Sequence, residues 1–198
     1  MPGAILMDPR RFYENTKGAP AMPSLLLALQ HWQAPPGLAV DLGCGAGRDT
    51  LELLRQGWQV LAVDAEPLAF DYLQPLVPGD QRAALRCACS PFQDIELPAA
   101  ELINGSFSLP FCAPADFPGF WRRIEQAVKP GGLFAGHFFG ERDDWAQDGL
   151  SIHTRAEVEA LFQHWQIIDL QEIDRPGQTA VGRAKHWHLF AVVARRQS

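Results

Sequence analysis

Short apolar runs alternate with amphipathic stretches along this chain, and that alternation predicts strands separated by helices. The predicted strands cover residues 38–42, 58–63, 84–89, 101–107, 133–139, 166–172 and 187–194. Helices among the first five strands are typical of βαβ units in a mainly parallel sheet. The pattern therefore predicts an α/β fold with a seven-stranded sheet.

The predicted helices show apolar positions at helical spacing. The clearest stripe joins Phe117, Phe120, Trp121, Ile124 and Val128 at intervals of three and four residues. Asp116 precedes this stripe and is expected to cap the helix. Further helices are expected at 24–32, 49–56, 67–74 and after the capping box that begins at Thr154.

Parts of both ends of the chain lack a regular pattern of hydrophobic positions. Residues 1–20 are expected to form a lid or an irregular segment, whereas residues 21–198 form the main domain. Residues 174–182 are polar and contain glycine, so a turn or loop is expected there. The last two strands have no helix between them and must pair antiparallel, because a parallel return needs a crossover of about a dozen residues.

Composition narrows the classes of function. The chain has 198 residues, a net charge of -6 and 47% hydrophobic residues, as expected for one globular domain. The acidic balance argues against a general nucleic-acid binder. The sequence shows no signal peptide or membrane span, and its four cysteines lack zinc or disulfide spacing. A cytoplasmic protein with reduced thiols and no membrane partner is expected.

A glycine-rich loop follows the first predicted strand. It reads Asp41-Leu42-Gly43-Cys44-Gly45-Ala46-Gly47, with glycines at alternate positions. Glycine allows a tight turn and a close approach of a ligand to the backbone. The dinucleotide fingerprint needs a glycine where this chain has Arg48. The loop therefore favours a ligand without a phosphate.

Asp64 ends the second predicted strand, 21 residues after Gly43. A carboxylate at this place can accept two hydrogen bonds from a ribose diol, and it would repel a 2′-phosphate. Asp41 precedes the turn and is expected to orient the loop and to receive an ammonium group, directly or through water. Loop and carboxylate together predict a nucleoside site.

On these residues the chain resembles the class I S-adenosylmethionine-dependent methyltransferases. Lys129-Pro130-Gly131-Gly132-Leu133 adds to the likeness, because it resembles the turn before their fifth strand. The stretch from Gly43 to Asp49 resembles that of the TehB-like, tellurite-resistance group. The resemblance implies a Rossmann-like, doubly wound sheet of order 3-2-1-4-5-7-6 with strand seven antiparallel, and S-adenosyl-L-methionine as cofactor.

The loop and the resemblance together predict the cofactor-binding residues. They are Asp41, Gly43, Cys44, Gly45, Gly47, Asp64, Ala65, Ser90, Phe92 and Asn104. The family commonly has an acid near the adenine, where this chain has Cys89 or Ser90, so the adenine contact stays open. Phe92 is either an adenine contact or a core residue.

Methyl transfer from a sulfonium mainly requires alignment of the acceptor and exclusion of water. The candidates for a catalytic role are Tyr13, His137 and His186, while Tyr13 and Lys17 are candidates for a lid over the site. His186 and His188 share a strand face, but no matching third ligand is evident, so no metal site is predicted. Cys44 is expected to be a packing residue rather than a nucleophile.

Three functions remain open from the residues alone. The first is methyl transfer to a small molecule or a soft anion, the second an NAD-dependent oxidoreductase, and the third a non-catalytic S-adenosylmethionine-binding module. Neither the acceptor nor the oligomeric state follows from the sequence.

Overall fold

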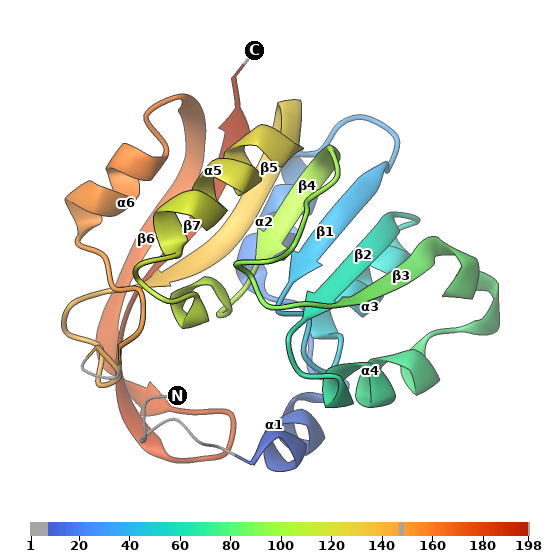
Figure 1. Ribbon diagram of the computed structural model, residues 1–198, viewed down its shortest axis with the longest axis horizontal. Coiled ribbons are helices and arrows are strands. Elements are labelled where there is room, and N and C mark those ends of the chain that lie inside the picture. Colours follow the sequence, from blue (N-terminus) through green and yellow to red (C-terminus); the bar gives the residue numbers. More distant parts are fainter. Residues whose placement is uncertain (1–7, 147–148, 198) are drawn as a thin grey trace.

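The computed structural model describes residues 8–146 and 149–197. One seven-stranded sheet runs through it in the order β3-β2-β1-β4-β5-β7-β6, with helices on both faces (Figure 1). This confirms the expected fold class and strand order. The strands are β1 (Leu38–Leu42), β2 (Gln59–Asp64), β3 (Leu85–Cys89), β4 (Ala100–Gly105), β5 (Val128–Phe139), β6 (Trp165–Gln178) and β7 (Ala184–Arg196).

Strands β1 to β5 are parallel, and β7 pairs antiparallel with both β5 and β6. The helices are α1 (Pro9–Thr16), α2 (Pro23–His31), α3 (Arg48–Arg55), α4 (Leu68–Leu73), α5 (Phe117–Ala127) and α6 (Arg155–Leu161). Three short 3₁₀ helices are η1 (Gln74–Leu76), η2 (Gly79–Ala84) and η3 (Leu109–Phe111). None of the helices described is both long and apolar enough to cross a bilayer.

The two faces of the sheet carry separate apolar layers, as the period of two along each strand requires. On β5, Phe134 and Phe138 pack into the layer formed with α5 and α6. Leu133 and Ala135 pack into the other layer, with α2, α3 and α4. Residues of β5 are thereby buried on both faces, which explains their near-continuous apolar run.

The prediction that residues 1–20 are irregular was wrong for 9–16, which form α1. Pro9 suits the first turn because its missing N–H needs no partner there, and Asp8 accepts a hydrogen bond from the Arg10 N–H at 3.0 Å. Residues 1–7 of the predicted lid lie outside the described residues. Helix α1 lies beyond the carboxyl edge of the sheet, next to α4 (Figure 1).

The predicted loop at 174–182 was also wrong in part. β6 continues to Gln178 and β7 begins at Ala184, so the two strands form a long ribbon that extends past the sheet (Figure 1). Only 179–183 turn. Main-chain pairing compensates for the weak strand propensity of the polar residues and Gly177, and Pro176 is tolerated because β6 is an edge strand.

Two cap predictions had different outcomes. The capping box of Thr154 and Glu157 is present, with both reciprocal hydrogen bonds. Asp116 occupies the cap position of α5, but its side chain makes no cap hydrogen bond. The backbone of Asp116 is already in the helical region, so its carboxylate does not fold back onto the first turn.

Candidate functional site

The glycine loop lies at the carboxyl ends of β1 and β2, where ligands bind in open α/β sheets. Gly43 and Gly47 have φ of 71° and 88°, a region that favours glycine. A Cβ on Gly43 would lie 2.3 Å from Cβ of Ser108, and one on Gly47 would lie 2.3 Å from Cδ1 of Leu73. The turn is therefore closed to side chains at both positions.

Backbone hydrogen bonds wrap this loop around the end of β2. The N–H groups of Gly43 and Cys44 donate to the carbonyl of Val63 at 2.8 and 2.9 Å. The carboxylate of Asp64 accepts from the Gly45 N–H and the Glu66 N–H, both at 2.9 Å. Each of these two oxygens keeps a second lone pair for a ligand.

The Asp64 side chain is half-buried at the rim of the loop. Burial raises the pKa of Asp64, and the hydrogen bonds from Glu66 and Gly45 oppose that shift. The position and the remaining acceptor capacity suit a ribose diol. Ala65 follows it and is exposed at the same rim.

Asn104 joins two buried carboxylates beneath the loop. Its amide nitrogen donates to Asp41 at 2.8 Å and to Asp49 at 2.9 Å, and its amide oxygen accepts from Ser106 at 2.9 Å. The other oxygen of Asp41 accepts from the Thr50 hydroxyl at 2.6 Å. Asp41 comes from β1, Asp49 and Thr50 from α3, and Asn104 from β4, so the network locks these three elements together.

Sequence reasoning missed Asp49 and Thr50 as members of this network. The sequence shows Asp49 in the first turn of a predicted helix, where an acid stabilises the helix. It does not show that Asp49 meets Asn104, which lies 55 residues away. Asp49 also accepts from the Met22 N–H at 2.8 Å, which ties the chain before α2 to the loop.

The electrostatics of Asp41 follow from its surroundings. Burial, and then the charge of Asp49, raise the pKa of Asp41 to about 7, although Thr50 and Asn104 donate to it. Both oxygens are used inside the protein and the residue is 2% exposed. Its geometry supports the predicted role in orienting the loop, while direct contact with a ligand stays a prediction.

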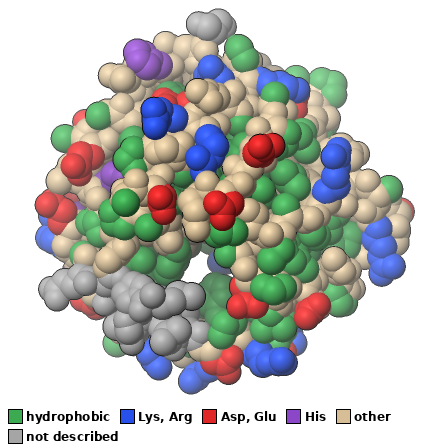
Figure 2. Space-filling model, viewed as in Figure 1, with side chains coloured by type: hydrophobic (Ala, Val, Ile, Leu, Met, Phe, Trp, Pro, Cys, Tyr) green, Lys and Arg blue, Asp and Glu red, His purple; other side chains and the backbone are tan. Residues whose placement is uncertain are grey.

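Helix α1 covers the loop from outside. Cε1 of Tyr13 lies 3.7 Å from where a Gly45 Cβ would be, and its ring packs against Tyr72 with centroids 5.5 Å apart. Burial, and then the charges of Asp64 and Glu66, raise the pKa of Tyr13 far above its usual value. The phenol therefore stays protonated and faces the rim that carries Asp64. Figure 2 shows a hollow between the strand ends and α1.

Two further groups at the loop are constrained. Burial raises the pKa of the Cys44 thiol well above its usual value, so this thiol is a poor nucleophile. Arg48 donates two hydrogen bonds, at 3.0 and 2.8 Å, to the carbonyl of Pro20. Lys17, the other lid candidate, pairs with Glu14 on the exposed side of α1.

His137 lies near the end of β5 and is 3% exposed. Its ring stacks on Phe107 with centroids 4.2 Å apart, and its Nδ1 has no hydrogen-bond partner in the described part of the chain. Burial, and then the charge of Arg48, lower the pKa of His137 to about 3. The imidazole is neutral at physiological pH and is a weak base.

Among the other predicted residues, Ser90 lies beside Asp64, because its backbone N–H donates to the Asp64 carbonyl at 3.0 Å. Phe92 stacks on Phe120 at 4.7 Å and packs against the core, while Ser90 donates to the carbonyl of Pro91. His186 bonds Asp174 at 2.6 Å on the β6–β7 ribbon, and alternation places it on the opposite face of β7 from Trp187. Adenine contacts from Ser90 and Phe92 therefore stay predictions.

A cluster of possible metal ligands also lies on this ribbon. Glu172, Asp174 and His188 have ligand atoms within 4.8 Å of one another. Arg142 already bonds Glu172 at 3.0 Å and Asp174 at 2.7 Å, and its backbone N–H donates to Nδ1 of His188 at 3.0 Å. The acids are thus occupied by a guanidinium, which a metal ion would have to displace.

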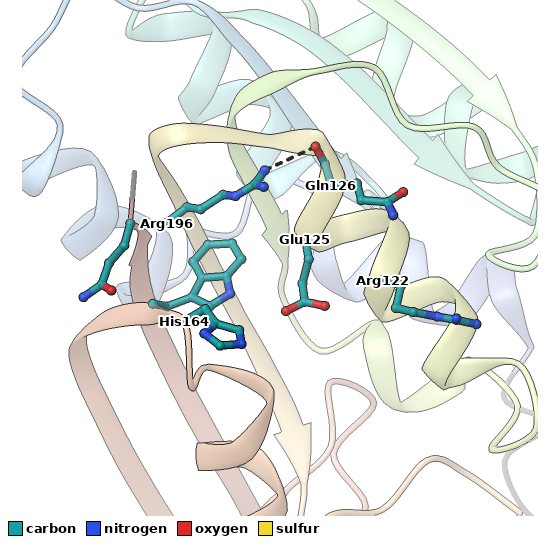
Figure 3. A pocket seen from close by; sticks show the side chains of 7 residues that line it. Arg122, Glu125, Gln126, His164 and Arg196 are labelled. Carbon is teal, nitrogen blue, oxygen red and sulfur yellow. Dashed lines mark hydrogen bonds between the residues drawn. The ribbon is translucent and has the colours of Figure 1, made fainter.

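A surface pocket of about 490 Å³ lies at the opposite edge of the sheet, between the end of α5 and the end of β7. Figure 3 shows it lined by polar side chains, among them Arg122, Glu125 and His164, with Arg196 donating to the carbonyl of Gln126. It contains none of the predicted site residues and lies far from the glycine loop.

Comparisons with known proteins agree with this geometry. Residues 39–132 match the family described as "Methyltransferase domain". An uncharacterized methyltransferase of Synechocystis sp. is 31% identical over 172 residues, which are 83% of this chain and 76% of that protein.

Two solved structures show the same fold. TehB from Haemophilus influenzae has a TM-score of 0.75 and 15% identity, covering 89% of this chain and 62% of its own. The 1,6-didemethyltoxoflavin-N1-methyltransferase of Burkholderia thailandensis was solved with 1,6-didemethyltoxoflavin and S-adenosylhomocysteine. It has a TM-score of 0.68 and 24% identity, and the match covers 89% of this chain and 77% of that one. This chain therefore spans less than two thirds of the TehB chain.

Proposed function

Because the chain belongs to the class I S-adenosylmethionine-dependent methyltransferases, we propose that it methylates a small-molecule acceptor at the carboxyl edge of its sheet. The observation that carries the proposal is the pairing of Asp64 with the Gly45 N–H. It places a half-buried carboxylate, with acceptor capacity left over, beside a glycine turn whose neighbouring cation, Arg48, is bonded to the carbonyl of Pro20. A nucleoside without phosphates fits this arrangement.

Bound S-adenosylmethionine supplies a methyl group on a positively charged sulfur, which is an activated leaving group. The residues of the chain then have three tasks: to bind, to orient and to exclude water. Asp64 binds the ribose, the network of Asp41, Asn104 and Asp49 holds the loop in shape, and Tyr13 covers it. Residues 1–20 act as the lid and residues 21–198 as the catalytic domain.

A small acceptor is supported by the chain's charge and by one neighbour. The net charge of -6 disfavours a nucleic-acid acceptor. The Burkholderia thailandensis enzyme carries its small acceptor on the same fold. Helix α1 and the tip of the β6–β7 ribbon both extend beyond the carboxyl edge, which supports a site of limited size (Figure 1).

Two of the three catalytic candidates are poor general bases, because the pKa of His137 is lowered to about 3 and that of Tyr13 is raised. His186 is bonded to Asp174 on the β6–β7 ribbon. We therefore propose an acceptor atom that is nucleophilic without help from His137 or Tyr13, so that catalysis rests mainly on alignment. The oxidoreductase alternative is disfavoured, because the loop offers no third dinucleotide glycine.

The proposal is tested by calorimetry with S-adenosylhomocysteine and NAD. Wild-type protein is expected to bind S-adenosylhomocysteine and not NAD. Asp64→Ala should weaken binding by roughly ten- to a hundredfold, as the loss of one or two hydrogen bonds predicts. Asp71→Ala, an exposed acid on α4, is the matched control and should leave the affinity unchanged.

Circular dichroism and thermal melts without ligand establish that Asp64→Ala is folded. An Asp64→Ala protein that is folded and binds with wild-type affinity would remove the ribose assignment. Transfer of a labelled methyl group to small-molecule acceptors then measures the activity itself.

A further inference from the structure

Five aromatic rings gather beside the carboxyl ends of β4 and β5. We call them the aromatic platform: Phe107, Phe111, Phe139, Trp145 and Trp187. Neighbouring ring centroids lie 5.6–6.5 Å apart. Phe139 is buried, but the other four keep exposed surface, and Phe111 is 47% exposed. Phe139 belongs to a small buried cluster with Leu150 and Leu189, and the partly exposed rings pack against its edge, where a flat ligand could stack on them.

The platform borders the place where the methyl group would be presented. Phe107 follows β4 directly, two residues after Gly105 and three after Asn104. Phe139 and Trp187 alternate with Ala135, the partner of Asn104 in the sheet, so they lie on the face that carries the Asn104 network. This placement of the platform beside the methyl group rests on the function proposed above.

Phe107 is held in a strained conformation. Among the described residues it is the one non-glycine residue with positive φ, at 56°. Bulky side chains avoid this region, and strain of this kind gathers at functional sites. The strained backbone places the Phe107 ring against His137 at 4.2 Å and edge-on to Trp187 at 5.6 Å.

The polar groups around the platform favour an uncharged ligand. The ammonium of Lys185 lies 3.6 Å from the Trp187 ring centroid and 4.3 Å from that of Trp145, and it is ion-paired with Asp143. Both charged side chains are at most 2% exposed, so their charges cancel inside the protein. Arg48, which lies near His137, is turned to the carbonyl of Pro20.

His137 supplies the second, independent observation. It is buried, and Nδ1 lacks a partner in the described part of the chain. A buried polar atom without a partner is costly, and a ligand group can compensate that cost. The imidazole therefore has unused hydrogen-bonding capacity beside the Phe107 ring.

We propose that the acceptor is a flat heteroaromatic ring that packs against the aromatic platform and is methylated on a ring-borne nitrogen or sulfur. The lone pair of that atom forms the bond to the methyl carbon while the carbon–sulfur bond breaks and its electron pair stays on the sulfur. The product ring carries the positive charge, or it loses the proton of an N–H or S–H group to water. Aromatic stacking selects the acceptor, and His137 orients it.

The test uses quinoline and 2-mercaptobenzothiazole as aromatic probes, with decahydroquinoline and tellurite as non-aromatic ones. Labelled S-adenosylmethionine reports methyl transfer by the whole chain. The two aromatic probes are expected to accept the methyl group, and the non-aromatic ones to react at least tenfold more slowly. Equal or faster methylation of decahydroquinoline or tellurite would overturn the inference.

Two variants test the platform itself. Phe111→Ala and Trp145→Leu remove partly exposed rings and should raise KM for the aromatic probes roughly three- to tenfold, with kcat little changed. Affinity for S-adenosylhomocysteine should stay within about twofold. Leu76→Ala, which shortens a 41% exposed side chain on η1, is the matched control. It should change neither KM for the aromatic probes nor the affinity for S-adenosylhomocysteine.

The outcomes separate the two proposals. If S-adenosylhomocysteine binds but neither aromatic probe is methylated, or both variants keep the wild-type KM, the heteroaromatic acceptor is wrong and the proposed function stands. If S-adenosylhomocysteine fails to bind the wild-type protein, the proposed function fails as well.

Discussion

The side-chain amide of Asn104 donates a hydrogen bond to the buried carboxylate of Asp41 at 2.8 Å. The same nitrogen donates to Asp49, so one neutral amide separates two buried acids. Asn104→Leu would leave both carboxylates without this donor in a site that water does not reach. We expect a loss of roughly 2–4 kcal/mol in the free energy of unfolding at pH 8, measured by urea denaturation.

The size of that loss depends on pH, because Asp41, whose pKa is raised to about 7, is protonated at low pH and then tolerates the missing donor better. At pH 5 the destabilisation by Asn104→Leu should be clearly smaller than at pH 8. An equal loss at both pH values would show that packing, not charge, sets the cost of the substitution.

The raised pKa of Asp41 also predicts how the stability of the wild-type protein depends on pH. Its pKa is raised to about 7 by burial and by Asp49, whereas an unfolded aspartate titrates near 3.9. Between these values the folded state binds more protons than the unfolded state, so this contribution to stability falls as pH rises from about 4 to about 7 and is level above that. The expected change is on the order of a few kcal/mol.

Asp41→Asn removes the titration and keeps the shape. The difference in unfolding free energy between Asp41→Asn and wild type should therefore grow in favour of the variant from pH 4.5 to pH 7.5. Because other acids titrate in both proteins, the difference isolates Asp41. A difference that does not change with pH would contradict the raised pKa.

The closed turn at Gly43 predicts a contrast between two glycines with positive φ. Gly43 has φ 71° and no room for a Cβ beside Ser108, whereas Gly131 has φ 77° and nothing within 4 Å. Gly131→Ala should cost about 1–2 kcal/mol, the strain of the left-handed conformation alone. Gly43→Ala should cost more and should also weaken binding of S-adenosylhomocysteine, measured by calorimetry. Equal losses for both would mean that Ser108 moves aside freely.

Tyr13 is expected to act by covering the loop rather than by moving a proton. Tyr13→Phe keeps the ring that lies over Gly45, so its affinity for S-adenosylhomocysteine and its methyl-transfer rate should stay within about threefold of wild type. Tyr13→Ala removes the ring and should weaken binding about tenfold, in line with the loss of a buried side chain. Arg11→Ala, an exposed residue on the same helix, is the control. A Tyr13→Phe protein that binds normally but transfers no methyl group would assign the phenol a chemical role.

The buried pair of Lys185 and Asp143 predicts a large coupling. Lys185→Met leaves Asp143 charged and buried, although the N–H groups of Trp145 and His188 still donate to it. We expect a loss of about 3–5 kcal/mol, partly restored in the double variant with Asp143→Asn. Lys129→Met, which breaks the half-exposed pair with Glu101, should cost at most about 1 kcal/mol. A double variant no more stable than Lys185→Met would contradict the coupling.

The chain's own pattern determined most of the fold, because strand and helix periodicity are local properties. Apolar runs predicted all seven strands, five of them to within three residues at each end, and the alternate glycines predicted the loop beside Asp64. β5 begins five residues earlier than expected, at Val128, which the helical stripe had included. The pattern was wrong for α1 and for the outer part of the β6–β7 ribbon. In both places the residues are polar or irregular, and packing on Tyr72 or main-chain pairing between the strands stabilises the element instead.

Only the tertiary structure decided which side chains meet. Asn104 and Asp41 are 63 residues apart in the chain, and Phe92 packs on Phe120 rather than standing free. The rings of the aromatic platform come from three separate stretches of the chain. Such contacts depend on strand order and register, which bring distant residues together across the sheet. Short-range pattern carries no information about them, since each residue alone suits many partners.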